Sequence, residues 1–98
     1  MVWQACEDFS SQERARVISK FRALSLLKLI TCSRGLEVEE LLEEVGTGLN
    51  EQDRERLYQE RNKQFTRSCL VTAVRQLENK GFVYFKGTKY YCQVKPQQ

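Results

Sequence analysis

Hydrophobic residues recur at helical spacing in three stretches of this chain and at alternating positions in a fourth. The first stretch begins with Val17, Phe21 and Leu24, which follow one another at intervals of three or four residues. It continues into ALSLLKLI, residues 23–30, which is apolar on nearly every side. Because a helix that is apolar all round must be covered from several directions, this stretch predicts a central helix.

A start signal and a stop signal mark the limits of this helix. Ser10 and Glu13 have the spacing of a capping box, in which the serine accepts from the amide three residues on and the glutamate reaches back. The sequence SRG at residues 33–35 ends the pattern, because glycine suits the left-handed conformation that closes many helices. We expect the helix at about residues 11–32.

A second, shorter helix is predicted at residues 37–45, and the sequence GTG ends it. Its apolar side chains share one face and its glutamates lie largely on the other, as in a helix that packs by one side. The inward set is Val38, Leu41, Leu42 and Val45, and the outward set is Glu39, Glu40, Glu43 and Glu44.

Residues 46–65 form a polar connection to the third helix. Charged and amide side chains dominate residues 50–65, where the large apolar anchors are Leu57, Tyr58 and Phe65. This composition suits either a solvated helix opened by Asn50 or a mobile insertion, and we favour a short polar helix.

The third helix is predicted at residues 66–79, with Thr66 as its N-cap and Gly81 as its left-handed stop. One face of this helix is apolar, and the opposite face is polar without a carboxylate. The apolar face holds Leu70, Ala73, Val74 and Leu77, and the polar face holds Ser68, Thr72, Arg75, Gln76 and Asn79. Side chains of these polar types contact base edges and phosphates in DNA grooves, and they also suit an ordinary solvated surface.

After Gly81 the apolar period changes from helical to alternating, which predicts a hairpin of Phe82–Lys86 with Lys89–Val94. Gly87 and Thr88 suit the centre of a type II′ turn, which needs glycine first. The resulting register places Val83, Phe85, Tyr90 and Cys92 on a face toward the core, and Tyr84, Tyr91, Lys86 and Lys89 on the other. Two lysines directly across a ladder repel each other, so they either blunt a sheet edge or meet an anion.

Composition limits the classes of function. The 98 residues, 41% hydrophobic, suffice for one domain, and no apolar run approaches the ~20 residues that cross a bilayer, so we expect no membrane association. The chain has no histidine, its four cysteines form no C-x-x-C motif, and it has no glycine-rich phosphate loop. We therefore expect reduced cysteines in an intracellular protein, no metal or other cofactor, no small-molecule substrate and no enzymatic activity.

Charge is unevenly distributed along the chain. Residues 1–60 carry 8 Lys+Arg and 12 Asp+Glu, a net charge of −4, whereas residues 61–98 carry 8 and a single glutamate, a net charge of +7. This asymmetry indicates a basic working face, provided that the fold separates the two segments.

Three helices followed directly by a glycine-turned hairpin is the order of elements in a winged helix-turn-helix domain, an α+β fold. The stretch TRSCLVTAVRQLENKGFVYF, residues 66–85, is similar to the segment that joins the third helix to the wing in many such domains. More loosely, the sequence resembles the C-terminal winged-helix domains of eukaryotic replication proteins of the origin-recognition and MCM helicase families. The resemblance implies one winged-helix domain over residues 1–98. Its parts would be an N-terminal arm at 1–9, a polar insertion at 46–65, a wing at 82–94 and a tail at 95–98.

Winged-helix domains commonly bind duplex DNA with the third helix in the major groove and the wing on the backbone or minor groove. The resemblance therefore implies groove contacts from Arg67, Ser68, Thr72, Arg75, Gln76 and Asn79, and phosphate contacts from Lys80, Lys86 and Lys89. The 20-residue connection from Gly46 to Phe65 is longer than the turn of a tight helix-turn-helix.

Two hypotheses for the function follow. The first is a DNA-binding domain of a nuclear protein, for instance in DNA replication. The second is a protein-docking module of a larger nuclear complex, favoured by the acidic second helix, the apolar first helix and Trp3 with Val2.

Overall fold

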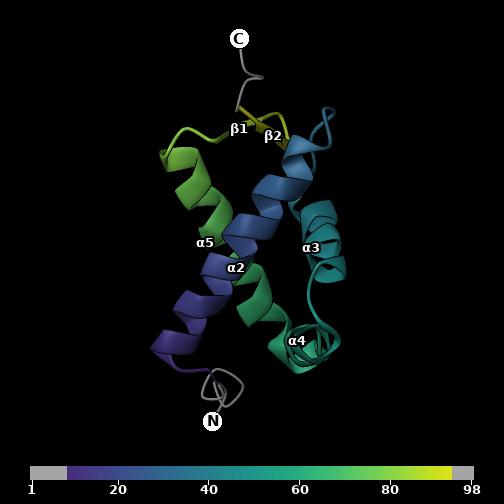
Figure 1. The fold of residues 1–98 in the computed structure, drawn as a ribbon, viewed down its shortest axis with the longest axis vertical. Helices are drawn as coiled ribbons and strands as arrows, with labels where there is room; N and C mark the ends of the chain where they lie inside the picture. The colour runs from purple at the N-terminus through teal and green to yellow at the C-terminus, as the bar shows by residue number, and fades with distance from the viewer. Residues whose placement is uncertain (1–8, 94–98) are drawn as a thin grey trace.

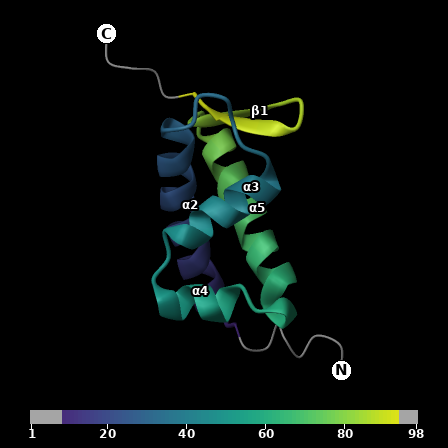
Figure 2. The same ribbon diagram turned by 90° about the vertical axis from the view of Figure 1, so that its right-hand side faces the viewer.

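Two long helices cross each other, and a β-hairpin lies across one end of the pair (Figures 1 and 2). The computed structural model describes residues 9–93, and these residues form an α+β fold. Its elements are α2 (Ser11–Ile30), α3 (Val38–Thr47), α4 (Glu51–Leu57), the short 3-10 helix η1 (Glu60–Asn62), α5 (Lys63–Asn79), β1 (Val83–Lys86) and β2 (Lys89–Cys92). The most extensive packing is between α2 and α5, and α3 packs against both of these helices. The polar helix α4 lies at the end opposite the hairpin (Figures 1 and 2).

The predicted start of α2 is confirmed in one of its two hydrogen bonds. The Ser10 hydroxyl accepts from the amide of Glu13 at 3.1 Å. The Glu13 carboxylate, expected to reach back to the first amide, is instead held by the guanidinium of Arg56 in α4. The helix ends at Ile30, two residues before the expected limit, and the Thr31 hydroxyl donates to the carbonyl oxygen of Lys28 at 2.9 Å. An interhelical ion pair has thus replaced half of the local capping box.

The polar connection is largely helical. The predicted helix opened by Asn50 is confirmed as α4, because the Asn50 side chain accepts from the amide of Asp53 at 2.7 Å. The connection is also shorter than residues 46–65. Helix α3 continues through Thr47 to a cap at Gly48, and α5 begins at Lys63.

Thr66 is not the N-cap of α5 as expected. It lies within the helix and is buried, and its hydroxyl lies 3.0 Å from the Asn62 carbonyl and contacts the Leu57 carbonyl. The physical reason is η1, whose turn at Glu60–Asn62 leads directly into α5 and starts the helix three residues earlier. Thr66 therefore joins the end of α4 to α5 from inside the protein.

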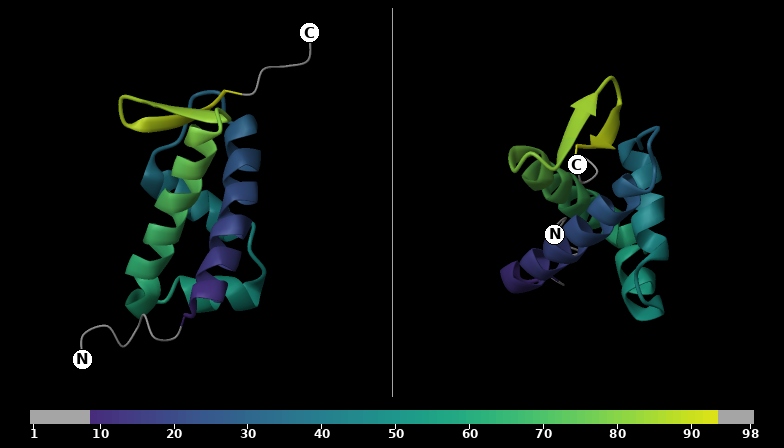
Figure 3. Two further views of the ribbon diagram at one scale, coloured as in Figure 1. Left: turned by 90° about the vertical axis from the view of Figure 1, so that its left-hand side faces the viewer. Right: turned by 45° about the horizontal axis from the view of Figure 1, so that its top comes forward.

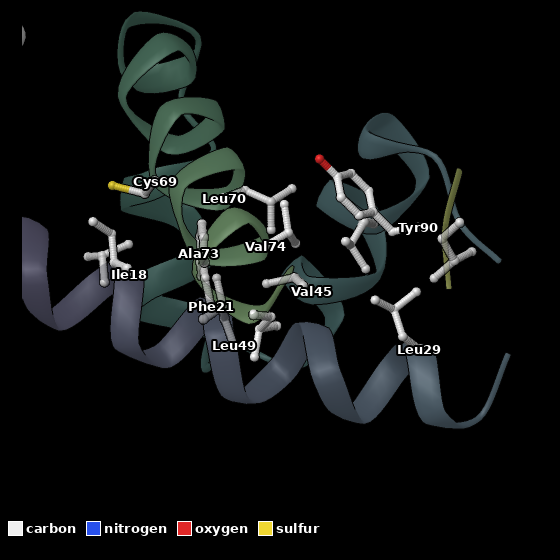
Figure 4. Close-up of a cluster of buried hydrophobic side chains, with 14 of the residues drawn as sticks. Ile18, Phe21, Leu29, Val45, Leu49, Cys69, Leu70, Ala73, Val74 and Tyr90 are labelled. Carbon is white, nitrogen blue, oxygen red and sulfur yellow. The ribbon is translucent and has the colours of Figure 1, made fainter. Parts of the chain in front are cut away.

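The core lies where α2, α3 and α5 meet (Figure 4). Phe21 projects into it from α2 and is fully buried. The predicted inward faces of α3 and α5 are confirmed, with the α3 glutamates exposed on the other side. The inward residues of α5 are Leu70, Ala73, Val74 and Leu77, joined by Thr66 and Cys69.

Phe9 belongs to this core and not to an arm, which corrects the expected N-terminal boundary. Its ring stacks on that of Phe65 with centroids 3.8 Å apart, and the Arg56 guanidinium carbon lies 4.7 Å from the Phe9 ring centroid. Because Phe9 is 8% exposed, it closes the end of the α2–α5 contact that lies away from the hairpin. Trp3, Val2 and Cys6 lie outside the described residues.

The predicted hairpin register is confirmed at every pair. Val83 pairs with Cys92, Tyr84 with Tyr91, Phe85 with Tyr90 and Lys86 with Lys89. Gly87 has φ +68°, and among the described residues only glycines have positive φ, so the turn at Gly87 and Thr88 is of the predicted II′ type.

The hairpin is tied to the helices on both sides. Gly81 has φ +86°, and the amides of Gly81 and Phe82 donate to the carbonyls of Glu78 and Leu77, both at 3.0 Å, which is a Schellman closure of α5. On the other side, Leu36 in the α2–α3 connection exchanges two backbone hydrogen bonds with Tyr90, at 3.0 and 2.8 Å. The hairpin therefore carries a third, one-residue strand on the β2 edge.

One predicted core position is wrong. Val83 and Tyr90 are buried and Cys92 is half-buried, but Phe85 is 48% exposed. The hairpin overhangs the helix pair toward its turn (Figure 3, left), and at this position only the β2 strand is paired further, through Leu36. Tyr90 is therefore buried, whereas its partner Phe85 lies on the β1 edge, where its ring contacts that of Tyr90 at a centroid distance of 4.7 Å.

Candidate nucleic-acid interface

Basic side chains gather around the hairpin end of the protein. Lys80 is the C-cap of α5, Lys86 and Lys89 face each other beside the turn, and Arg75 lies about one turn before the end of α5. Arg34 is exposed in the connection that Leu36 anchors to β2. Of these side chains only that of Lys89 is half-buried. The fold thus collects cations from three separate segments at one end.

The predicted contact residues divide into two groups according to their partners. Five of them make no side-chain hydrogen bond or ion pair within residues 9–93 and are exposed or half-buried. These residues are Arg75, Asn79, Lys80, Lys86 and Lys89. Their polar groups already face solvent, so an external ligand would break no internal contact.

Three other predicted contact residues are engaged inside the protein. Arg67 forms an ion pair with Glu39 of α3. Ser68 accepts from the guanidinium of Arg14 at 3.2 Å, and the Gln76 oxygen accepts from Arg22 at 2.6 Å. Both arginines belong to α2, so α2 lies along one side of the expected groove face. Thr72, between the two arginine contacts, is half-buried.

The exposed surface of α5 also carries one carboxylate, which lies beside the polar face that the sequence defines. Burial raises the pKa of the Tyr90 phenol, the negative charge of the exposed Glu78 raises it further, and Arg75 opposes this increase. At the hairpin turn, Glu37 accepts from the Thr88 hydroxyl at 3.0 Å. These two carboxylates reduce the positive charge of the hairpin end without removing it.

Sequence reasoning missed the arginines of α2. Arg14 and Arg22 come from the N-terminal 60 residues, which are acidic in sum, so segment charge gave no indication that they lie beside α5. The available signal was their spacing. Arg14, Ile18, Phe21 and Arg22 fall on one side of the helix, which places the two arginines at the border of the buried face.

The described cysteines Cys32, Cys69 and Cys92 are free thiols. Cys69 is fully buried, and this burial raises the pKa of its thiol to about 11 against the opposing charge of Arg14, whose guanidinium lies 3.8 Å from the sulfur. Across residues 9–93, no three Cys, Asp or Glu side chains gather in a way that suits a metal ion. In the same range, no helix is both long and apolar enough to span a bilayer.

Comparison of the chain with protein-family models, with curated proteins and with solved structures finds no match.

Proposed function

We propose that this domain binds duplex DNA through the C-terminal half of α5 and the hairpin. The observation that carries this proposal is the group of cations Arg75, Lys80, Lys86 and Lys89 at one end of the fold, which have no hydrogen-bond or ion-pair partner among residues 9–93. Phosphate contacts from lysine and arginine supply most of the affinity in such complexes, since each contact releases condensed counterions.

The order of the elements supports the winged-helix assignment that the sequence suggests. Helix α5 enters the hairpin through the Gly81 corner, and Leu36 adds a short third strand from the α2–α3 connection. Because α4 lies at the far end (Figure 2), the insertion leaves the C-terminal half of α5 open. On this proposal the domain belongs to a nuclear protein that acts on DNA, for instance in its replication.

The internal contacts change the expected division of roles along α5. Arg67, Ser68 and Gln76 would each have to leave a partner in α3 or α2 before touching a base. Base-edge contacts therefore fall mainly to Arg75 and Asn79, which are exposed. With so few groups for direct readout, the proposed binding is driven by phosphate contacts and has a weak sequence preference.

A salt titration of duplex binding tests the proposal. Replacing both Lys86 and Lys89 with glutamate should weaken binding and reduce the slope of log affinity against log salt by about 1.8, since each phosphate contact contributes ~0.9. The matched comparison is between the single variants Lys86→Glu and Lys63→Glu, which make the same charge change at the hairpin and on α5 at the end away from it. Absence of wild-type binding at low salt refutes the proposal, and so does an equal effect of Lys63→Glu and Lys86→Glu.

A second candidate function, docking to a protein partner within a larger nuclear complex, is favoured by α2. Leu27 and Ile30 are 56% and 53% exposed, and Ala23 on the same side of the helix is also exposed. Light scattering on the purified chain separates the two functions. A dimer or a complex that assembles without nucleic acid favours docking, whereas a monomer that binds duplex DNA opposes it.

A further inference from the structure

The hairpin has a second exposed surface, on the side away from the core. Phe82, Tyr84 and Lys86 alternate along the β1 side of this outer face, and Tyr91 and Lys89 stand across from the last two. Phe82 continues the ladder, because its carbonyl accepts from the amide of Gln93 at 2.7 Å. Phe82 and Tyr84 are 41% and 40% exposed. The outer face is therefore a row of aromatic rings that ends in two lysines.

Part of this row is held in place by the fold. The rings of Tyr84 and Tyr91 stack with centroids 5.3 Å apart and an angle of 14° between their planes. Tyr91 in turn covers Gly35, where a Cβ atom would lie only 2.6 Å from the ring. Because Gly35 has φ +81° and no side chain, Tyr91 fits between its backbone and Tyr84. Tyr84 is thus the outer ring of a stack that the fold supports. Because this ring is already held in place, it loses less conformational entropy when a further ring stacks on it.

The charges around the row indicate an anionic ligand. Lys86 and Lys89 end the outer face, Lys80 precedes Phe82 by two residues, and none of the three has an ion-pair partner in the described part of the chain. The two acids of this end are Glu37, which accepts from the hydroxyl of Thr88, and Glu78, and the three lysines outnumber them. A ligand that satisfies the whole face must carry negative charge and also offer flat rings.

The spacing of the row suits nucleobases. Alternate residues of a strand are ~6.7 Å apart, about twice the 3.4 Å that separates successive bases in one DNA strand. A base that stacks on the face of Tyr84 opposite Tyr91 therefore has the exposed ring of Phe82 close by for the next base of the strand. Bases in a duplex are already stacked on one another, so only unpaired bases can use this surface.

We propose that the outer face of the hairpin, formed by Phe82, Tyr84 and Tyr91 with Lys86 and Lys89, is a stacking site for the unpaired bases of single-stranded nucleic acid. This site shares Lys86 and Lys89 with the proposed duplex interface and goes beyond it, because its specific component is the aromatic row of Phe82, Tyr84 and Tyr91, which the duplex contacts do not use. An acidic peptide would satisfy the lysines but would leave the rings without flat partners, so single strands are favoured.

Fluorescence anisotropy with a labelled oligothymidylate and a labelled duplex tests this site on the whole chain. Tyr84→Ala should lower the affinity for the single strand by about 5- to 150-fold, the range found when one stacked base loses its aromatic partner, and Phe82→Ala should act in the same direction. Tyr84→Phe should retain the affinity, since the ring is kept. The matched control is Phe85→Ala, which removes a similarly exposed ring from the opposite face.

The outcomes separate this site from the duplex function. A selective loss of single-strand affinity in Tyr84→Ala, with unchanged duplex affinity and an unchanged melting temperature, supports the proposal. It is overturned by unchanged single-strand binding in a folded Tyr84→Ala variant, or by an equal loss in Phe85→Ala. It is also overturned if the wild type binds an acidic peptide but no single strand. A chain that binds single strands but not duplex contradicts only the proposed duplex function.

Discussion

Leu77 is a sensitive position at which to test how α5 packs. This side chain is 4% exposed and lies on the helix face that the apolar pattern predicts. Its backbone carbonyl also accepts from the amide of Phe82 in the Schellman closure. Replacement by alanine leaves this backbone bond in place and removes only side-chain carbons, so the loss in stability reports packing.

The expected loss can be worked from burial. Three buried carbons are worth ~2.4 kcal/mol at about 0.8 kcal/mol each. If the site collapses only in part, a residual cavity of ~50 Å³ adds about 1.2 kcal/mol. The total, ~3.6 kcal/mol, falls within the 2–5 kcal/mol usual for Leu→Ala in a core and is a large part of the ~5–15 kcal/mol that stabilises a domain of this size.

Urea unfolding followed by circular dichroism measures this change, because the midpoint shifts while the slope stays constant if the two-state mechanism is kept. The matched control is Leu27→Ala, which makes the same chemical change at an exposed position of α2 and should cost less than ~0.5 kcal/mol. A loss below about 0.5 kcal/mol for Leu77→Ala would mean that this side chain is exposed and that the face of α5 is rotated.

Three further predictions follow from local contacts. Gly35→Ala should lower the melting temperature more than Gly87→Ala does, because both lose a left-handed glycine but only at Gly35 does the new Cβ meet a ring, that of Tyr91; equal losses would contradict the supported stack. Cys69 should react with iodoacetamide more slowly than the half-buried thiols of Cys32 and Cys92. Because burial raises the pKa of the Cys69 thiol from 9.0 to about 11, the protonated thiol contributes to stability below about pH 9, and this contribution is lost as the pH rises to about 11. If the fall in stability between about pH 9 and pH 11 is the same in Cys69→Ala as in the wild type, the raised pKa of Cys69 is refuted. Asn50→Ala should cost about 1 kcal/mol in thermal unfolding through the lost cap of α4, and Asn79→Ala, which removes an exposed amide without such a bond, should cost less.

Local signals predicted most of the secondary structure. The hairpin register follows from one glycine, since a type II′ turn at Gly87 fixes every pair across the ladder. The buried faces of α3 and α5 follow from helical periodicity, because a one-sided apolar pattern can be satisfied in only one orientation. The Asn50 cap was likewise predictable from the sequence, because its side chain accepts from the amide of Asp53, only three residues away.

The errors arose where a long-range contact competes with a local rule. Thr66 has the chemistry of an N-cap, but the turn at Glu60–Asn62 starts α5 earlier and turns the Thr66 hydroxyl toward Leu57. Glu13 has the spacing of a capping box, but the Glu13 carboxylate forms an ion pair with the charged guanidinium of Arg56 in α4. Phe85 alternates correctly with its neighbours, yet it lies on the β1 edge, whereas Leu36 pairs with the β2 strand.

In the candidate interface, too, some features follow from the sequence and others only from the tertiary structure. Sequence alone determined that residues 61–98 are basic, that Lys86 and Lys89 face each other, and that Tyr84 lies beside them, because charge, turn type and strand period are local properties. Only the tertiary structure decided which polar groups of α5 remain available. Arg14 and Arg22 reach Ser68 and Gln76 from 54 residues away, a distance in sequence that no helical or strand period spans. The same holds for Gly35, which becomes a support for Tyr91 only because Leu36 pairs with Tyr90 and brings the two segments together.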